Sequence, residues 1–332
     1  MKSKRNLWLD LYKLFLCWMV ISIHFCWDTY WYYPIYRLAV PLFFAISGFF
    51  IRREDLNQSL RASAQMIKRS FSYMLMGFAL YILFDFVLCY VDGKGVGYYF
   101  TTLFYENFLF EFFFLNMPIG YTGAQLWFLI ALFVISLVHY VLVRFGKVQF
   151  YRWIVPATML IQLFFGGYMR LFQETDMPIR YTRNAWFMGL PFFGMGYLLA
   201  GLKWKKRWYE LLTCLALGVF FTLLQVQEEA LVKTEVYAST IPATMFMLLF
   251  FTGLPSPKAD GYYRIFGKSM SFWIYILHMS VGVAIDRIWK IDSLFVRSLV
   301  ILAVSAATYL LGRGCVKFVL AMKKEGRCHA EV

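Results

Sequence analysis

Charged residues are scarce in this chain. They make up 16% of its 332 residues, compared with about 25% in a typical soluble globular domain. Hydrophobic residues make up 61% and aromatic residues 21%. Because apolar runs of membrane-spanning length follow one another, the composition excludes an ordinary soluble domain and predicts an all-α integral membrane protein.

The six cysteines lack the spacing of a metal site or of a disulfide framework. They are scattered, mostly inside apolar runs, and no Cys-x-x-Cys pair occurs. We interpret them as small buried hydrophobic residues and expect no metal cofactor.

Acidic residues are outnumbered, with 19 Asp and Glu against 33 Lys and Arg and a net charge of +14. Most of the basic residues fall in alternate loops between the apolar runs. The positive-inside rule then predicts that both termini are cytoplasmic. It also explains the net charge without a nucleic-acid partner.

The apolar runs predict a single membrane domain over residues 1–332, a bundle of about ten transmembrane helices with a short basic cytoplasmic tail at 314–332. The first run follows a basic segment, but it contains Asp10 and Lys13 and has no small-residue cleavage site, so we interpret it as a retained span rather than a signal peptide. The aromatic stretch at 101–118 is interpreted as an interfacial or re-entrant helix, because counting it as a span would reverse the charge bias. The expected spans are 7–25, 35–51, 70–91, 124–143, 151–167, 186–202, 209–226, 239–254, 269–289 and 294–313.

A polar stripe runs along the first predicted helix. Eleven residues at about 100° each bring Lys13 and His24 to the same face, about 16 Å apart along the axis. Asp10 is three residues before Lys13 and can reach it. Three ionisable groups in one membrane helix are unfavourable, so they indicate a functional site.

His24 is the leading candidate for chemistry, because imidazole can take and return a proton near neutral pH. The alternative is a core histidine that bonds to a neighbouring helix. His278 lies mid-span with Tyr275 three residues earlier, and its alternative is a buried histidine that donates to a backbone carbonyl. We treat Tyr275 and His278 as candidate pore-lining residues.

The second span and the loop after it carry further candidates. Arg37 is either a snorkelling interfacial residue or part of a cavity, and Ser47 with Gly48 allows close backbone approach. The basic loop residues fit the positive-inside rule, but they also suit an anionic, phosphate-bearing donor. The donor-binding candidates are Arg37, Arg52, Arg53, Lys68 and Arg69.

Four segments together resemble the membrane acyltransferase-3 family. The first helix has a basic residue, ten residues and a histidine, at Lys13 and His24. The second helix has a Val-Pro-Leu-Phe-Phe-x-Ile-Ser-Gly-Phe core at 40–49. A Leu-Trp-Phe-Leu segment contains Trp127, which we add to the pore-lining candidates. The late segment Gly267-Lys268-Ser269-x-Ser271-Phe272-x-Ile274-Tyr275-x-x-His278 resembles the family's Gly-x-x-Ser-x-x-Ile-Tyr-x-x-His helix.

The resemblance implies a ten-helix enzyme of the cell (cytoplasmic) membrane that uses acyl-CoA, often acetyl-CoA, as co-substrate. It implies transfer of the acyl group to a hydroxyl of an envelope or exported carbohydrate or glycolipid, in an envelope-glycan pathway. The resemblance implies that His24 is the catalytic histidine of the family. Lys13 and Asp10 complete the candidate catalytic set. His24 would act either as a base on the acceptor hydroxyl or as a transient acyl carrier.

Two other functions remain open at this stage. A transporter or flippase of a small molecule or lipid-linked glycan would also use intramembrane charges, although the sequence shows no inverted repeat. A purely structural partner in a glycan assembly would leave Lys13 and His24 without a role.

Overall fold

The computed structural model describes residues 6–25, 32–95, 97–98, 107–118, 122–172, 178–257, 260–267 and 269–328. Within these ranges every regular element is helical. The chain divides into two compact units, Met1–Cys26 with Ser256–Val332, and Trp27–Pro255. We call them the first and the second unit and describe each by itself. The expectation of one membrane domain stays a prediction.

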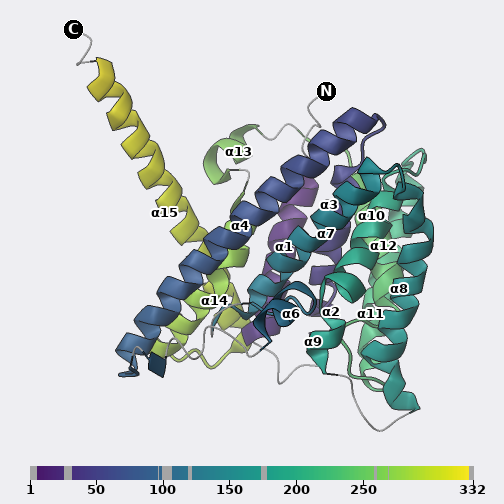
Figure 1. Cartoon of the computed structure of the whole chain (residues 1–332), viewed down its shortest axis with the longest axis horizontal. Coiled ribbons are helices and arrows are strands. Elements are labelled where there is room, and N and C mark those ends of the chain that lie inside the picture. Colours follow the sequence, from purple (N-terminus) through teal and green to yellow (C-terminus); the bar gives the residue numbers. More distant parts are fainter. Residues whose placement is uncertain are drawn as a thin grey trace. The chain divides into compact units, whose positions relative to one another are not determined.

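The first unit is built around the N-terminal helix. Its helices are α1 (Leu7–Phe25), α13 (Asp260–Phe266), α14 (Met270–Ile288) and α15 (Leu294–Cys328), and α1 packs on both α14 and α15 (Figure 1). The indole Nε1 of Trp18 donates to the Ser298 hydroxyl at 2.9 Å, and the Cys17 thiol contacts the carbonyl oxygen of Ser271 at 3.1 Å. These contacts fix the rotation of α1 against its neighbours.

The second unit contains the remaining helices. Long helices α4 (Leu56–Val91), α7 (Trp127–Arg144), α8 (Tyr151–Gly166) and α11 (Trp208–Glu229) surround α3 (Ala39–Ile51), α10 (Leu190–Leu199) and α12 (Thr240–Gly253) (Figure 1). The short elements are α2 (Tyr33–Tyr36), α6 (Phe108–Phe113), η1 (Ala124–Leu126), η2 (Val148–Phe150), η3 (Tyr168–Leu171), α9 (Ile179–Thr182) and the π-helical turn η4 (Ala185–Gly189).

Helices α3 and α10 cross at two glycines. A Cβ atom on Gly48 would lie 1.9 Å from the carbonyl oxygen of Phe193, and one on Gly196 would lie 1.9 Å from that of Ala45. Only glycine permits this approach, which brings the two backbones into direct contact. The Ser47-Gly48 pair was expected to allow a close approach, and the structure has one there.

Six helical segments are long and apolar enough to cross a membrane among the described residues. They are Leu7–Phe25, Tyr33–Ile51, Leu56–Val91, Ala124–Arg144, Trp208–Glu229 and Leu294–Val316, and Ala185–Leu199 and Thr240–Gly253 are shorter apolar helices. Helices α8 and α14 also lie where spans are predicted. The chain is therefore a multi-pass, all-helical protein, and the count of ten spans and the cytoplasmic placement of both termini stay predictions.

Two helices are longer than the hydropathy pattern predicts. Helix α4 starts at Leu56 rather than at 70, because the Asp55 carboxylate caps it by accepting from the backbone N–H of Gln58 at 2.8 Å. The first half of α4 contains charged residues, so the apolar pattern is absent there although the helix is continuous. Helix α15 continues to Cys328, through the segment predicted as a tail, because that segment contains no proline and many good helix formers.

The aromatic stretch at 101–118 is only partly described, since residues 101–106 lie outside the described ranges. Its described part forms α6, which has six residues. At about 1.5 Å per residue a helix of this length is far too short to cross a hydrocarbon core of about 30 Å.

Candidate functional site

Asp10 and Lys13 form an ion pair on α1, as the stripe predicts. The Lys13 ammonium lies 3.1 Å from Asp10 Oδ1, and both side chains are half-buried. The hydroxyl of Tyr263, on α13, donates to the other carboxylate oxygen of Asp10 at 2.7 Å. Asp10 therefore has a positive partner and a hydroxyl donor, which satisfies a carboxylate at the membrane helix end.

The other end of the stripe is held by the residue next to His24. The ring of Phe25 fills the space beside Gly282 of α14, where a Cβ atom would lie 2.0 Å from the ring. The guanidinium of Arg297, on α15, lies 5.5 Å from the Phe25 ring centroid and pairs with Asp286 of α14. The last turn of α1 is thus fixed between two helices, and His24 with it.

His24 and His278 face each other. Their ring centroids are 5.4 Å apart with an angle of 38° between the ring planes, and His24 is half-buried while His278 is fully buried. His278 Nδ1 lies 2.6 Å from the carbonyl oxygen of Tyr275. Because a carbonyl only accepts, Nδ1 carries the proton and Nε2 presents a lone pair. Nε2 is buried without a hydrogen-bond partner among the described residues.

In the first unit, Asp10 and Lys13 lie towards one end of α1, and His24 lies at the other end against His278 of α14. Tyr275 contributes its carbonyl and lies buried. A histidine with a fixed tautomer beside a second histidine can hold or accept a proton at a defined nitrogen. The contact of His278 Nδ1 with the Tyr275 carbonyl is the one expected of a buried histidine that donates to a backbone carbonyl, and a chemical role for His24 and His278 stays a prediction.

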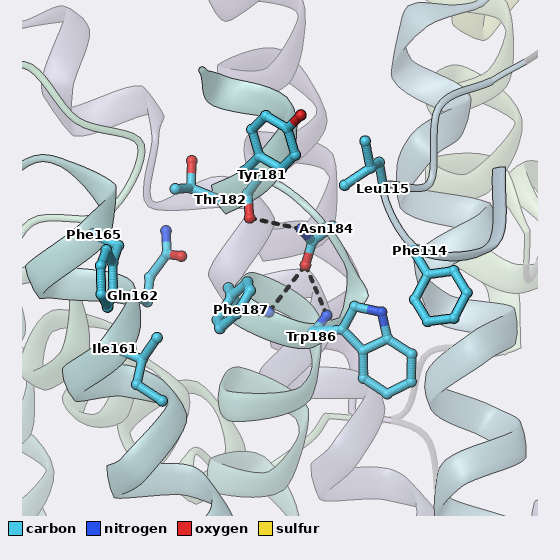
Figure 2. A pocket seen from close by; sticks show the side chains of 10 residues that line it. All are labelled: Phe114, Leu115, Ile161, Gln162, Phe165, Tyr181, Thr182, Asn184, Trp186 and Phe187. Carbon is cyan, nitrogen blue, oxygen red and sulfur yellow. Dashed lines mark hydrogen bonds between the residues drawn. The ribbon is translucent and has the colours of Figure 1, made fainter. Parts of the chain in front are cut away.

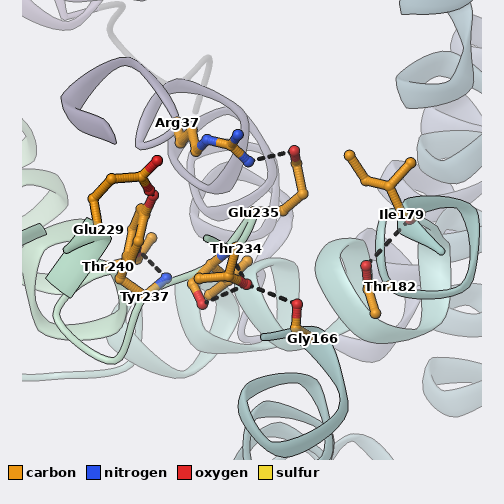
Figure 3. Close-up of polar contacts among 10 residues, drawn as sticks. Arg37, Gly166, Ile179, Thr182, Glu229, Thr234, Glu235, Tyr237 and Thr240 are labelled. Carbon is orange, nitrogen blue, oxygen red and sulfur yellow. Dashed lines mark hydrogen bonds and ion pairs between the residues drawn. The ribbon is translucent and has the colours of Figure 1, made fainter. Parts of the chain in front are cut away.

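Arg37 lies in the second unit and is neutralised by an acidic partner from this chain. It forms an ion pair with Glu235 (Figure 3). Its guanidinium carbon lies 5.0 Å from the centroid of the Tyr33 ring. The loop 230–239, which carries Glu235, is anchored by the Thr234 hydroxyl on the Gly166 carbonyl at 3.0 Å. Donor binding by Arg37 stays a prediction, and any anion there must compete with Glu235.

A tyrosine of the same loop is paired with a second acid. The Tyr237 hydroxyl donates to Glu229 at the end of α11. Burial is the main cause that raises the pKa of Tyr237 well above its usual value, and the nearby Arg37 opposes it. The hydroxyl is therefore a permanent donor to Glu229, while Glu235 of the same loop pairs with Arg37.

The other four predicted donor-binding residues separate into two groups. Arg52 and Arg53 line a pocket of about 690 Å³, together with Lys203 from the chain after α10. The guanidinium of Arg52 lies 5.0 Å from the Tyr197 ring centroid and donates to the Tyr197 carbonyl at 3.3 Å. Lys68 and Arg69 are exposed on α4, and neither is among the residues that line this pocket.

The two other pore-lining candidates also lie in the second unit. The Ser47 hydroxyl donates to the Phe43 carbonyl at 2.8 Å within its own helix. Trp127 is buried, with the Arg183 guanidinium 5.6 Å from its ring centroid, and both residues line a pocket of about 290 Å³. A pore-lining role for Ser47 and Trp127 stays a prediction.

Sequence reasoning missed the partners that come from distant parts of the chain. No sequence motif marks Tyr263, Glu235 or Lys203. The only signal for them is an unexplained charge elsewhere in the chain, which needs a partner. Across the described part of the chain, no group of three or more His, Cys, Asp or Glu side chains could hold a metal ion.

A family profile described as an acyltransferase domain matches residues 6–312. The chain belongs to the acyltransferase-3 family. The resemblance drawn from four short segments is thereby confirmed, and the match includes α1 and both units. No curated protein and no solved structure matches the chain. As a family member with several membrane-length helices, it is a membrane acyltransferase.

Proposed function

We propose that this enzyme of the cytoplasmic membrane moves an acyl group from acyl-CoA to a hydroxyl group. The proposed acyl group is acetyl, and the proposed acceptor is an envelope or exported carbohydrate or glycolipid. The observation that carries the proposal is the contact between His24 on α1 and His278 on α14. The other end of α1 holds the Lys13–Asp10 ion pair. An imidazole in such a pair is the group that an ester-forming transfer needs as its base.

The chemical step starts with His24. Its neutral nitrogen accepts the proton of the acceptor hydroxyl while the hydroxyl oxygen attacks the thioester carbonyl carbon. The carbon–sulfur bond then breaks, and the departing thiolate takes the proton from the His24 imidazolium. The products are an ester and free coenzyme A, and His24 is neutral again.

His278 supports His24 as a positioning residue. Its Nδ1–H is used by the Tyr275 carbonyl, so Nε2 carries the lone pair, and Nε2 is buried without a hydrogen-bond partner among the described residues. Because the two rings are 5.4 Å apart, we propose that this lone pair stabilises the imidazolium that forms at His24 during transfer and restricts the ring orientation.

The charged part of the donor needs cations, and the pocket with Arg52, Arg53 and Lys203 supplies three against one carboxylate, that of Glu54. A volume of about 690 Å³ is in the range of pockets that take cofactor-sized ligands. We propose that this pocket binds the phosphates of acyl-CoA. Lys13, at the opposite end of α1 from His24, stabilises charge near the thioester arm.

The test compares His24→Ala with the wild type in proteoliposomes that contain labelled acetyl-CoA and candidate carbohydrates. Loss of a general base lowers transfer by about 10²- to 10⁴-fold. The matched control is His139→Asn, because His139 is a buried histidine of the second unit whose Nδ1 contacts the Tyr151 hydroxyl at 3.1 Å. This control should transfer at nearly the wild-type rate.

Three outcomes would contradict the proposal. Full transfer by a stably folded His24→Ala variant excludes His24 as the base. Label that stays on the enzyme after acid quenching, in the absence of acceptor, indicates an acyl carrier instead. Uptake of a solute without any acyl transfer indicates a transporter.

A further inference from the structure

A pocket of about 390 Å³ opens in the second unit beside η4 and the end of α8. Its walls are largely apolar, with Phe114, Ile161, Phe165 and Phe187 around it (Figure 2). Phe114 is 53% exposed, and Ile161 and Phe165 are 40% and 41% exposed. In a membrane protein, apolar side chains exposed at a pocket rim are in reach of lipid hydrocarbon.

Two polar groups in this pocket lack partners among the described residues. Gln162 is only 2% exposed, yet neither its amide oxygen nor its amide nitrogen has a hydrogen-bond partner. The indole Nε1 of Trp186 is buried and unpaired as well. Burying an amide without a partner is unfavourable, so such groups in a cavity indicate a ligand that satisfies them.

The neighbouring polar side chain is already occupied. Asn184 accepts from the backbone N–H groups of Trp186 and Phe187 at 2.9 and 3.1 Å, and its amide donates to the Tyr181 carbonyl at 2.8 Å (Figure 2). These bonds cap η4 and hold the Trp186 side chain at the pocket. Thr182 bonds to the Ile179 carbonyl, so Gln162 and Trp186, together with the hydroxyl of Tyr181, are the polar groups that remain for a ligand.

We propose that this pocket binds a membrane lipid through an uncharged amide or hydroxyl group next to its hydrocarbon chain. Gln162 offers a donor and an acceptor, so its complement is a group that both accepts and donates, and the Trp186 N–H adds a second donor. The residues that line the pocket include no charged side chain, so a phosphate is disfavoured inside it. The apolar walls take the adjoining methylene groups.

This site is independent of acyl transfer. It uses none of the residues assigned to the His24 site or to the Arg52 pocket, and its occupant does not have to be the acceptor. Water is the other way to satisfy Gln162, and the experiment separates the two.

The test uses the full chain in nanodiscs and two photoactivatable probes. One is a ceramide with a diazirine in its acyl chain, and the other is a diazirine-bearing hydrocarbon of the same length without an amide or hydroxyl. Labelled peptides are located by mass spectrometry. In the wild type the ceramide probe should label the pocket at least tenfold more than the hydrocarbon probe, and unlabelled ceramide should compete with it.

The key variant is Gln162→Leu, which keeps the volume and removes the hydrogen bonds. Pocket labelling by the ceramide probe should fall at least tenfold, while labelling by the hydrocarbon probe should not fall. Trp186→Phe should lose a smaller factor of about threefold. The matched control is Gln225→Leu, since Gln225 is a fully buried glutamine of α11 outside this pocket. That control should label like the wild type.

Unchanged ceramide labelling in folded Gln162→Leu overturns the proposal, as does equal labelling by the two probes, because either result means that water or unspecific hydrocarbon fills the pocket. If Gln162→Leu does not fold, Ile161→Trp provides the second variant. It fills the pocket from a side chain that is 40% exposed, and it should abolish labelling by the ceramide probe. Persistent labelling in that variant also overturns the proposal.

Discussion

The ring of His278 on α14 lies 5.4 Å from the ring of His24 on α1, centroid to centroid, and its tautomer is fixed by the Tyr275 carbonyl. Two histidines from opposite ends of the sequence thus form one pair. The pair brings a second imidazole of defined tautomer next to the candidate base of this membrane acyltransferase. The contribution of His278 to acyl transfer can therefore be measured in a variant that keeps the bond to the Tyr275 carbonyl.

Replacing His278 with asparagine should slow transfer without unfolding the protein. An asparagine amide can still donate to the Tyr275 carbonyl, but it lacks an atom at the position of Nε2. We expect kcat to fall by about 10- to 100-fold, with little change in the KM for acyl-CoA, because the imidazolium of His24 loses its support only in the transition state. The pH dependence of kcat should also shift. A purely structural histidine would leave the pH profile unchanged, and that result would contradict the assignment.

Replacing Arg52 with alanine should weaken donor binding. Loss of a charge-assisted contact to a phosphate corresponds to about 1.5–3 kcal/mol, so the KM for acyl-CoA should rise at least tenfold while kcat changes less. Lys68→Ala and Arg69→Ala are the matched controls, since these cations are exposed and do not line the Arg52 pocket. They should change KM by less than about twofold. Steady-state kinetics in detergent distinguish the cases, and equal effects at all three positions would indicate a general charge effect.

Breaking the Arg37–Glu235 pair should destabilise the second unit. Both side chains are largely buried, at 16% and 17% exposure, so Arg37→Met leaves a carboxylate without its partner. We expect a loss of about 3 kcal/mol in the free energy of unfolding for the single variant. The double variant Arg37→Met with Glu235→Leu should lose less than the sum of the two single variants. A double-mutant cycle of thermal unfolding measures this coupling, and additive losses would show that the pair contributes nothing.

Adding one methyl group where α3 crosses α10 should separate the two helices. In Gly48→Ala or Gly196→Ala the new Cβ meets a backbone carbonyl at 1.9 Å, and a backbone cannot move aside as a side chain can. We expect a loss of at least about 3 kcal/mol or failure to accumulate in the membrane. The control is Gly312→Ala in α15, where nothing lies within 4 Å of the added atom. Because alanine favours helix, that variant should be as stable as the wild type or slightly more stable, by fluorescence-detected chromatography after heating.

Local patterns in the sequence predicted the helices well. The first span was expected at 7–25, and α1 is Leu7–Phe25. The apolar run that follows the basic residues Lys2, Lys4 and Arg5 is what predicts this helix. The α4 boundary was placed at 70 rather than at Leu56, because hydropathy reports the membrane-length part of a helix and not the capped extension beyond it. The Asp10–Lys13 pair was predicted because both residues lie on one helix turn.

The sequence by itself determined the membrane class, the polar face of α1 and, through its family motifs, the acyltransferase assignment. These depend on composition and on spacings within single helices. Only the tertiary structure decided that His278 faces His24, that Tyr263 bonds to Asp10, that Glu235 neutralises Arg37, and that Arg52 shares a pocket with Lys203 but not with Lys68. Each of these joins residues far apart in the sequence, and the packing of helices and loops, rather than any local propensity, sets which of them meet.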